Sequence, residues 1–127
     1  MPGVRRYQDL VCWQLSTELQ DAVFAITASG DVHRDVKFCN QMRDATRSAT
    51  NNIAEGFARF APREFRRFLI IARGSLTEVH NQIGVGYRCG YFLESDYDRL
   101  SRLAARAAKA TGRLMRYLEE PRHRPTS

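Results

Sequence analysis

Cysteine and long apolar runs are scarce in this chain, and each scarcity excludes a class of protein. The three cysteines, Cys12, Cys39 and Cys89, lie far apart without a C-x-x-C pair, which predicts free, partly buried thiols in a reducing compartment. No apolar run approaches the roughly 18 residues of a membrane span. Near the N-terminus no apolar segment follows Arg5 and Arg6, so we expect no signal peptide. These absences predict a cytoplasmic protein that does not enter the membrane.

Residues that carry catalysis or hold metal ions are equally sparse. His33, His80 and His123 fall in a predicted loop, a predicted helix and the C-terminal tail, so they form no ligand cluster. Glu55 stands beside an apolar stripe, where burial would raise its pKa and suit it to general acid or base work. No second carboxylate, histidine or cysteine is spaced to act with it, so we favour a structural role. We therefore expect neither enzymatic activity nor a metal or other cofactor.

What the chain does contain is apolar residues that recur every three or four positions, the repeat of helices that pack on one another. The alternation that would indicate strands is absent. Asp9 is the expected N-cap of the first helix, and Ser95 with Asp98 forms a capping-box pattern for the fourth. Pro62 suits the first turn of the third helix, and Gly90 ends that helix. The predicted helices cover residues 9–27, 36–57, 62 to the stop at Gly90, and 95–120.

The connections between these helices are short, which forces neighbouring helices to run antiparallel. Residues 1–120 are therefore expected to form one all-α domain, an up-down-up-down four-helix bundle, and residues 121–127 a flexible tail. The helices carry more apolar surface than one bundle core requires, including Ile70 and Ile71 beside the third stripe. A second apolar face indicates contact with another subunit, so we favour an oligomer over a monomer with a broad core face.

Positive charge gathers in the second half of the chain. Residues 1–36 carry −2, whereas segments 59–78 and 95–118 carry +3 and +4, within a total of +6. Six cations of the last predicted helix follow a spacing of 3, 4, 3, 4, 3, which is the repeat of one helical face. In a heptad frame they occupy c and f positions, which point away from the core. Such a face suits an anionic partner or simply solvent. We call these residues the basic stripe: Arg99, Arg102, Arg106, Lys109, Arg113 and Arg116.

Further arginines on the second helix and around the turn that follows it extend the predicted basic surface. They are Arg43, Arg47, Arg59, Arg63, Arg66 and Arg67. Nothing aligns Asn, Gln or aromatic side chains for base reading, so binding would depend on the phosphates of RNA or DNA. The leading hypothesis is an oligomeric nucleic-acid-binding protein, with RNA as the favoured ligand. A scaffold for an acidic protein partner is the second hypothesis, and a small enzyme that uses Glu55 with a nearby arginine is the third.

A polar series within residues 41–59 is the most unusual stretch of the chain. These polar side chains lie next to the apolar stripe of their helix rather than opposite it, and polar groups at a packing edge need partners. Asn52 and Glu55 are expected to cap a neighbouring helix end or to bond across an interface. A helical Gly56 would cost about 1 kcal/mol relative to alanine. The series is Gln41, Ser48, Asn52, Glu55 and Gly56.

The same residues carry a resemblance to a known family. Residues 52–56 read NIAEG and are followed by Arg59, residues 41–43 read QMR, and residues 65–78 contain a Phe-Leu pair before a Gly-Ser-Leu-x-Glu run. With the opening at residues 7–14, these motifs closely resemble the bacterial four-helix bundle proteins named for the 23S rRNA intervening sequences in which some of their genes lie. The resemblance extends over nearly the whole chain.

The resemblance implies a four-helix bundle that assembles as a ring-like homopentamer, without an enzymatic activity common to the family. A related branch, the accessory variability proteins of diversity-generating retroelements, binds nucleic acid and a reverse transcriptase. A reverse-transcriptase-like partner is therefore the second kind of protein partner to expect. Asp44 stands where the family often has a second arginine.

Overall fold

The computed structural model describes residues 1–59 and 61–121, and their regular secondary structure is entirely helical, without a strand. Four long helices are joined by short connections, with a 3-10 helix before the first and a one-turn helix between the first and second. The elements are η1 (Tyr7–Asp9), α1 (Val11–Ile26), α2 (Asp31–Arg34), α3 (Val36–Phe57), α4 (Pro62–Arg88) and α5 (Glu94–Glu119). The predicted all-α class is confirmed. The predicted tail lies outside the described residues from position 122 onward.

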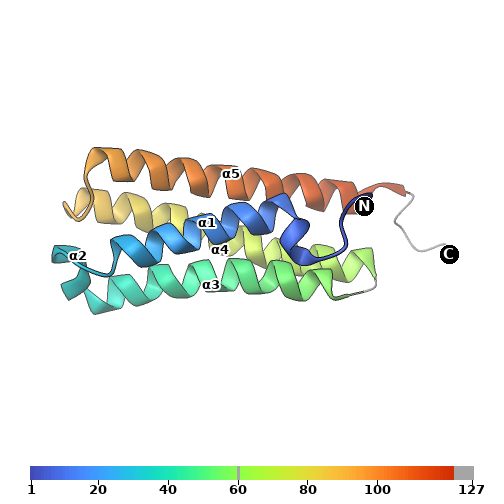
Figure 1. Cartoon of the computed structure of the whole chain (residues 1–127), viewed down its shortest axis with the longest axis horizontal. Coiled ribbons are helices and arrows are strands. Elements are labelled where there is room, and N and C mark those ends of the chain that lie inside the picture. Colours follow the sequence, from blue (N-terminus) through green and yellow to red (C-terminus); the bar gives the residue numbers. More distant parts are fainter. Residues whose placement is uncertain (60, 122–127) are drawn as a thin grey trace.

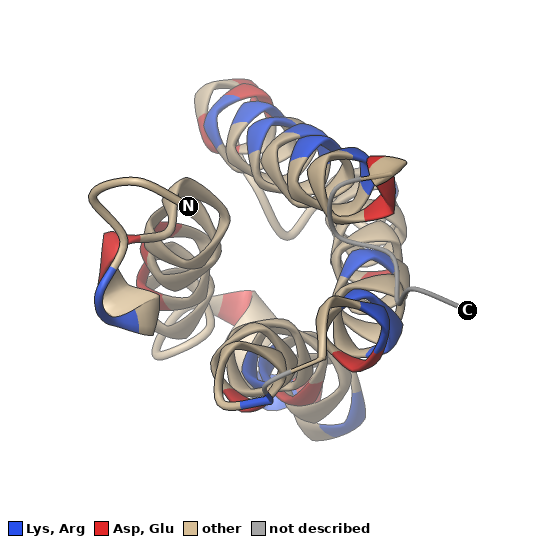
Figure 2. Cartoon of the chain, turned by 90° about the vertical axis from the view of Figure 1, so that its right-hand side faces the viewer, with Lys and Arg blue, Asp and Glu red and all other residues tan. Residues whose placement is uncertain are grey.

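The long helices lie side by side around a common interior (Figures 1 and 2). Each long helix contacts the next one in the chain, and α1 also contacts α5, which leaves α3 diagonal to α5. In Figure 1, α1 and α4 run from right to left, whereas α3 and α5 run from left to right. Within the described ranges, no helix combines the length and apolar content that crossing a bilayer requires.

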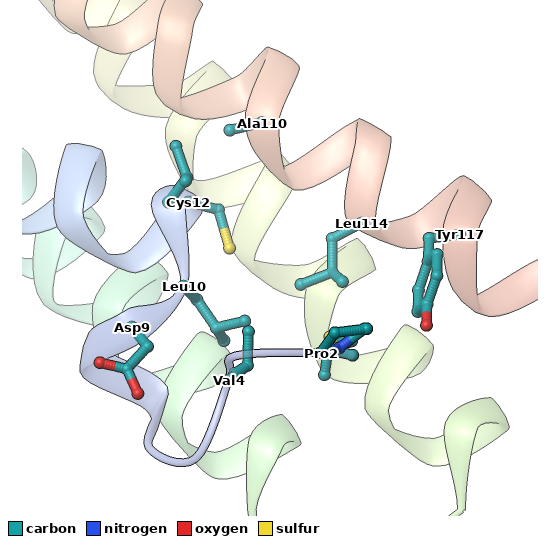
Figure 3. Close-up of a pocket in the computed structure, with 10 residues that line it drawn as sticks. Pro2, Val4, Asp9, Leu10, Cys12, Ala110, Leu114 and Tyr117 are labelled. Carbon is teal, nitrogen blue, oxygen red and sulfur yellow. The ribbon is translucent and has the colours of Figure 1, made fainter.

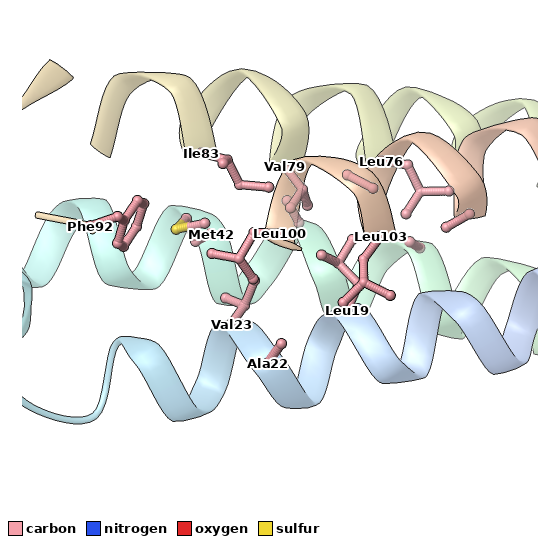
Figure 4. Close-up of a cluster of buried hydrophobic side chains, with 14 of the residues drawn as sticks. Leu19, Ala22, Val23, Met42, Leu76, Val79, Ile83, Phe92, Leu100 and Leu103 are labelled. Carbon is pink, nitrogen blue, oxygen red and sulfur yellow. The ribbon is translucent and has the colours of Figure 1, made fainter. Parts of the chain in front are cut away.

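Two clusters of buried side chains fill the interior. The first holds Leu19, Met42, Ile83 and Leu100 together from all four long helices (Figure 4). The second surrounds Ile53 at the end of the bundle where α3 turns into α4. Each fully buried side chain of this size contributes about 1.5–3 kcal/mol. Burial of these apolar side chains therefore fixes the rotation of each long helix about its own axis.

The cysteines divide between the core and the surface. Cys12 and Cys39 are buried, as predicted, whereas Cys89 is exposed, which corrects that prediction, because it follows the end of α4. Burial raises the pKa of Cys12 to about 11 and also raises that of Cys39. Both buried thiols are therefore protonated at neutral pH and belong to the packing of the core.

The predicted range of α3 and the start of α4 at Pro62 are confirmed, but both predicted N-caps are wrong. Asp9 belongs to η1, where its carboxylate accepts from the amides of Arg5 and Arg6, both at 3.2 Å, and α1 begins after Leu10. Ser95 lies inside α5, which begins at Glu94. A short polar side chain accepts from whichever unpaired amides lie nearest, and local sequence does not show where those amides will be.

Gly90 ends α4 as predicted. It has a φ of 78°, and its amide and that of Tyr91 donate to the carbonyls of Tyr87 and Gly86 at 3.0 and 2.9 Å. These two bonds form the Schellman arrangement, which satisfies the last carbonyls of the helix. An L side chain is strained at that φ, so glycine is required here.

Asp35 ties the loop after α4 to the beginning of α3. Its carboxylate accepts from the Tyr91 hydroxyl at 2.7 Å and from the Phe38 amide at 3.1 Å. The Tyr91 hydrogen bond, followed by that amide, lowers the pKa of Asp35, and the same bond raises the pKa of Tyr91 to about 12. One carboxylate therefore caps a helix and anchors a loop that is distant in sequence.

We expect Tyr91→Phe to raise the pKa of Asp35 toward its usual value, because the variant removes the hydrogen bond that lowers this pKa most. A lowered carboxylate pKa contributes stability above the unfolded pKa of about 3.9, and this contribution is lost as the pH falls through the folded pKa. The variant should therefore be less stable than the wild type above about pH 4, and it should lose less stability as the pH falls through the folded pKa of Asp35. NMR titration of Asp35, with urea unfolding from pH 3 to 7, measures both effects.

Tyr87→Phe is the matched control. The Tyr87 ring stacks on Tyr97 with centroids 4.4 Å apart at the same end of the bundle. The Tyr87→Phe variant should leave the Asp35 titration unchanged. An unchanged Asp35 pKa in Tyr91→Phe would contradict the proposed anchor.

Candidate nucleic-acid interface

The basic stripe lies along the outer face of α5. All six side chains are exposed, whereas Leu100, Ala107 and Thr111 of the same helix have no exposed surface. Figure 2 shows the cations as a row of blue bands along α5, at the top of the view. The predicted outward direction of the stripe is confirmed. Its rotation follows from burial, because the opposite face of α5 packs against α1 and α4.

The stripe carries its charge without compensation from the rest of the described chain. Across residues 1–59 and 61–121, no carboxylate oxygen lies within 4.0 Å of a stripe nitrogen, and no other described group hydrogen-bonds to a stripe side chain. Unpaired guanidinium and ammonium groups at this spacing create a positive potential along the helix. An extended anion that follows the helix axis meets them one after another.

Arg43 and Arg47 of α3 are engaged within the protein. The Arg43 Nε donates to Thr27 Oγ1 at 2.9 Å, and its guanidinium lies 5.2 Å from the Phe24 ring centroid. The Arg47 guanidinium lies 4.8 Å from the same centroid and pairs with Asp44 at 3.2 Å. Both arginines belong to the helix diagonal to α5. They clamp α1 to α3, and an added phosphate contact would compete with these bonds.

The arginines around the α3–α4 turn divide in the same way. Arg59 pairs with Glu55 at 2.8 Å and lies over the Phe68 ring at 5.0 Å. Arg66 forms an ion pair with Glu119 of α5. Arg63 and Arg67 are exposed near the start of α4 and form no ion pair with the described residues. Among the predicted contacts of this region, these two are the most available to a ligand.

Arg73 is a functional candidate that sequence reasoning missed. Its Nη1 lies 3.9 Å from the position that a Cβ on Gly112 would occupy, and the Nη1 of Arg116 lies 3.6 Å from the same position. Both guanidinium groups therefore lie beside the same position of α5, which carries no side chain. Arg73 was counted in the basic segment of the sequence, but only the packing of the helices shows that it extends the stripe.

The polar series of α3 faces α4 along one edge of the helix contact. Gln82 donates to Gln41 at 3.2 Å, and the hydroxyls of Ser48 and Ser75 are 2.7 Å apart. Asn52 bonds back to the Ser48 carbonyl at 2.7 Å within its own helix. Gln41 and Ser48 thus form side-chain hydrogen bonds between α3 and α4. Of the two roles expected for Asn52, the cap of a neighbouring helix end is not formed among the described residues, and the bond across an interface stays a prediction.

Gly56 allows α3 and α4 to approach closely at their turn. A Cβ at this position would lie 2.8 Å from the Phe65 ring, 2.8 Å from the Phe68 Cβ and 3.2 Å from the Phe65 carbonyl oxygen. Glu55 beside it is exposed and pairs with Arg59 instead of capping a neighbouring helix end, and its expected bond across an interface stays a prediction. Burial of Glu55, the premise for acid or base work, is also absent.

A shallow apolar hollow of about 310 Å³ lies where the N-terminal segment meets α5 (Figure 3). Leu10, Cys12, Leu114 and Tyr117 line it, and the carboxylate of Asp9 points away from them. The high pKa of Cys12 keeps this thiol from acting as a nucleophile at neutral pH. Within the described ranges, no three His, Cys, Asp or Glu side chains group as metal ligands. The basic stripe of α5 remains the candidate surface for binding an anion.

The chain was compared with protein families and with curated proteins. The family model described as 23S rRNA-intervening sequence protein matches residues 8–113, most of the chain. No curated protein matches it. The matched range includes the polar series, Gly56 and five of the six stripe cations, so the family pattern extends over both the α3–α4 contact and the basic face.

We expect two neighbouring substitutions in the 52–56 motif to differ in their effect on stability. Gly56→Ala should lower the free energy of unfolding by about 2 kcal/mol, because overpacking costs of up to about 3 kcal/mol exceed the gain of about 1 kcal/mol in helix propensity. Glu55→Gln should change it by less than about 0.5 kcal/mol, because an exposed ion pair contributes little. Urea unfolding of both variants measures the difference. A Gly56→Ala protein as stable as the wild type would mean that the close approach is not required.

Proposed function

This chain belongs to the 23S rRNA-intervening sequence protein family, and we propose that it is a non-enzymatic, oligomeric protein that binds nucleic acid, with RNA as its ligand, through phosphate contacts. The proposal includes an antiparallel up-down-up-down bundle as the protomer and a ring-like homopentamer as the assembly, in the cytoplasm.

The observation that carries the proposal is the contrast between the basic stripe and the other arginines. Arg43, Arg59 and Arg66 are held by bonds within the protein, whereas all six stripe cations are exposed and unpaired among the described residues. An unpaired row of cations is the part of the surface that gains most from releasing the counterions of a phosphate backbone. The stripe lacks asparagine, glutamine and aromatic side chains, which favours backbone contacts over base reading.

Oligomerisation would multiply this surface. A pentamer carries 5 × 6 = 30 net positive charges, from the +6 of each chain. Support for self-association comes from α4, where Ile70 and Ile71 are 42% and 51% exposed and no atom lies within 4 Å of a Cβ built on Gly74. An apolar outer face that also offers close approach suits a second helix.

We expect replacement of Ile70 and Ile71 by serine to dissociate the oligomer, because the outer face of α4 would lose its apolar contacts. Light scattering should then report the monomer mass of 14.6 kDa. Val36→Ser is the control, since Val36 is 64% exposed at the beginning of α3 and lies away from that face. A wild-type protein that is itself monomeric would contradict the assembly.

Binding by the stripe predicts a steep dependence on salt. Six phosphate contacts give a log–log slope of about −5 on duplex RNA, hence a loss of affinity of about a thousandfold between 50 and 200 mM salt. Alanine at Arg106, Lys109 and Arg113 should reduce the slope by about half. Fluorescence anisotropy with a labelled RNA duplex measures both values.

The control variant replaces Arg34, Lys37 and Arg88 by alanine, three exposed cations outside the stripe. It removes the same charge as the stripe variant, but from positions outside the proposed contact surface. It should therefore lower the affinity less and leave the salt slope closer to that of the wild type. Affinity that does not depend on salt would refute phosphate binding. If a protein partner remains bound after nuclease treatment and bare RNA does not displace it, the alternative is supported: a scaffold for an acidic or reverse-transcriptase-like protein.

A further inference from the structure

A small hollow in the groove between α1 and α5 gathers half of the basic stripe. Its volume is about 150 Å³, and its lining consists of Arg99, Arg102, Arg106, Leu103 and Glu18. The three arginines are three and four positions apart, so they lie on successive turns of one helix face. Leu103 is 5% exposed and contributes an apolar side chain to the lining. The surface is concave here because α1 lies beside this part of the stripe.

The charges of this hollow are unbalanced. Three guanidinium groups and one carboxylate give the lining a net charge of +2, from +3 − 1. Among the described residues, none of these arginines forms an ion pair or a side-chain hydrogen bond, and Glu18 is not paired with any of them. Like charges that converge beside an apolar surface repel one another unless an anion enters.

The chemistry of the lining selects among phosphate groups. A terminal phosphomonoester carries nearly two negative charges at pH 7 and three strong acceptor oxygens, whereas a diester within a strand carries one charge and two free oxygens. Three guanidinium forks and a net charge of +2 match the monoester. A hollow of about 150 Å³ has room for a group of the size of a phosphate.

We propose that this hollow is a subsite for the terminal phosphate of an RNA strand, bound by Arg99, Arg102 and Arg106. The inference rests on the proposed function and adds recognition of a strand end to it. Lys109, Arg113 and Arg116 continue the stripe on the same face, and Arg116 lies about 21 Å along the helix from Arg102. A strand whose end occupies the hollow can therefore extend its backbone along the remaining cations.

The test compares single-stranded RNAs of one sequence with an internal fluorophore and different ends: 5′-phosphate, 3′-phosphate, or hydroxyl at both ends. Anisotropy at fixed salt gives the affinity of each. We expect one phosphorylated end to bind about tenfold more tightly than the hydroxyl ends, which is the scale of charge-assisted bonds to an added group. Comparison of the 5′ and 3′ forms identifies which end the hollow receives.

Two variants of equal charge separate the subsite from a general effect of charge. Alanine at Arg102 and Arg106 should abolish the preference for the phosphorylated end. Alanine at Lys109 and Arg113 should weaken all three RNAs by a similar factor and keep the preference. All four side chains are exposed, so both variants should fold, which circular dichroism checks.

The outcomes distinguish the two proposals. Equal affinity of the wild-type protein for phosphorylated and hydroxyl ends, with the steep salt dependence intact, overturns the subsite and leaves phosphate binding by the stripe in place. A preference that survives alanine at Arg102 and Arg106 also overturns the subsite, because it then reflects charge alone. The absence of binding to every RNA overturns both proposals.

Discussion

The burial of one face of α5 against α1 and α4 is the constraint on which the rest of the surface depends. Leu100, Ala107 and Thr111 have no exposed surface, and turning the helix to bring the cations inward would place charges in an apolar interior. Several unpaired charges in such an interior would cost more than the roughly 5–15 kcal/mol of net stability that a folded domain has. The exposed stripe is therefore the necessary counterpart of the core. The packing of the helix thus decides that these cations face solvent.

The arginines show how the same residue type serves two purposes in one small protein. Arg43 and Arg47 lie over Phe24, where the flat guanidinium covers an aromatic ring and clamps α1 to α3. The stripe arginines have no such ring or carboxylate within the described chain. The surroundings also differ within the stripe. Its first three arginines, Arg99, Arg102 and Arg106, border a hollow with Glu18 of α1. The net charge of the chain alone does not distinguish these cases.

The residues of the 52–56 motif are mainly engaged in packing and in bonds within the bundle. Ile53 is fully buried, Gly56 admits two phenylalanines of α4, and Asn52 bonds within α3. These contacts set the angle and distance at which α3 meets α4. The most recognisable motif of the chain therefore maintains the shape of the bundle, whereas the candidate binding surface lies on the helix diagonal to it.

The helical class, the range of α3, the stop at Gly90 and the outward direction of the stripe can be predicted from the amino-acid sequence, because each follows from spacing within a single segment. The packing of the helices is needed to show that Asp9 bonds to the amides before η1, that Asp35 anchors Tyr91, and that Arg73 lies near Gly112. It also decided which arginines are engaged and where the hollow lies. Helical periodicity repeats every few residues and can be read locally, whereas these contacts join residues whose distance depends on how four helices pack together.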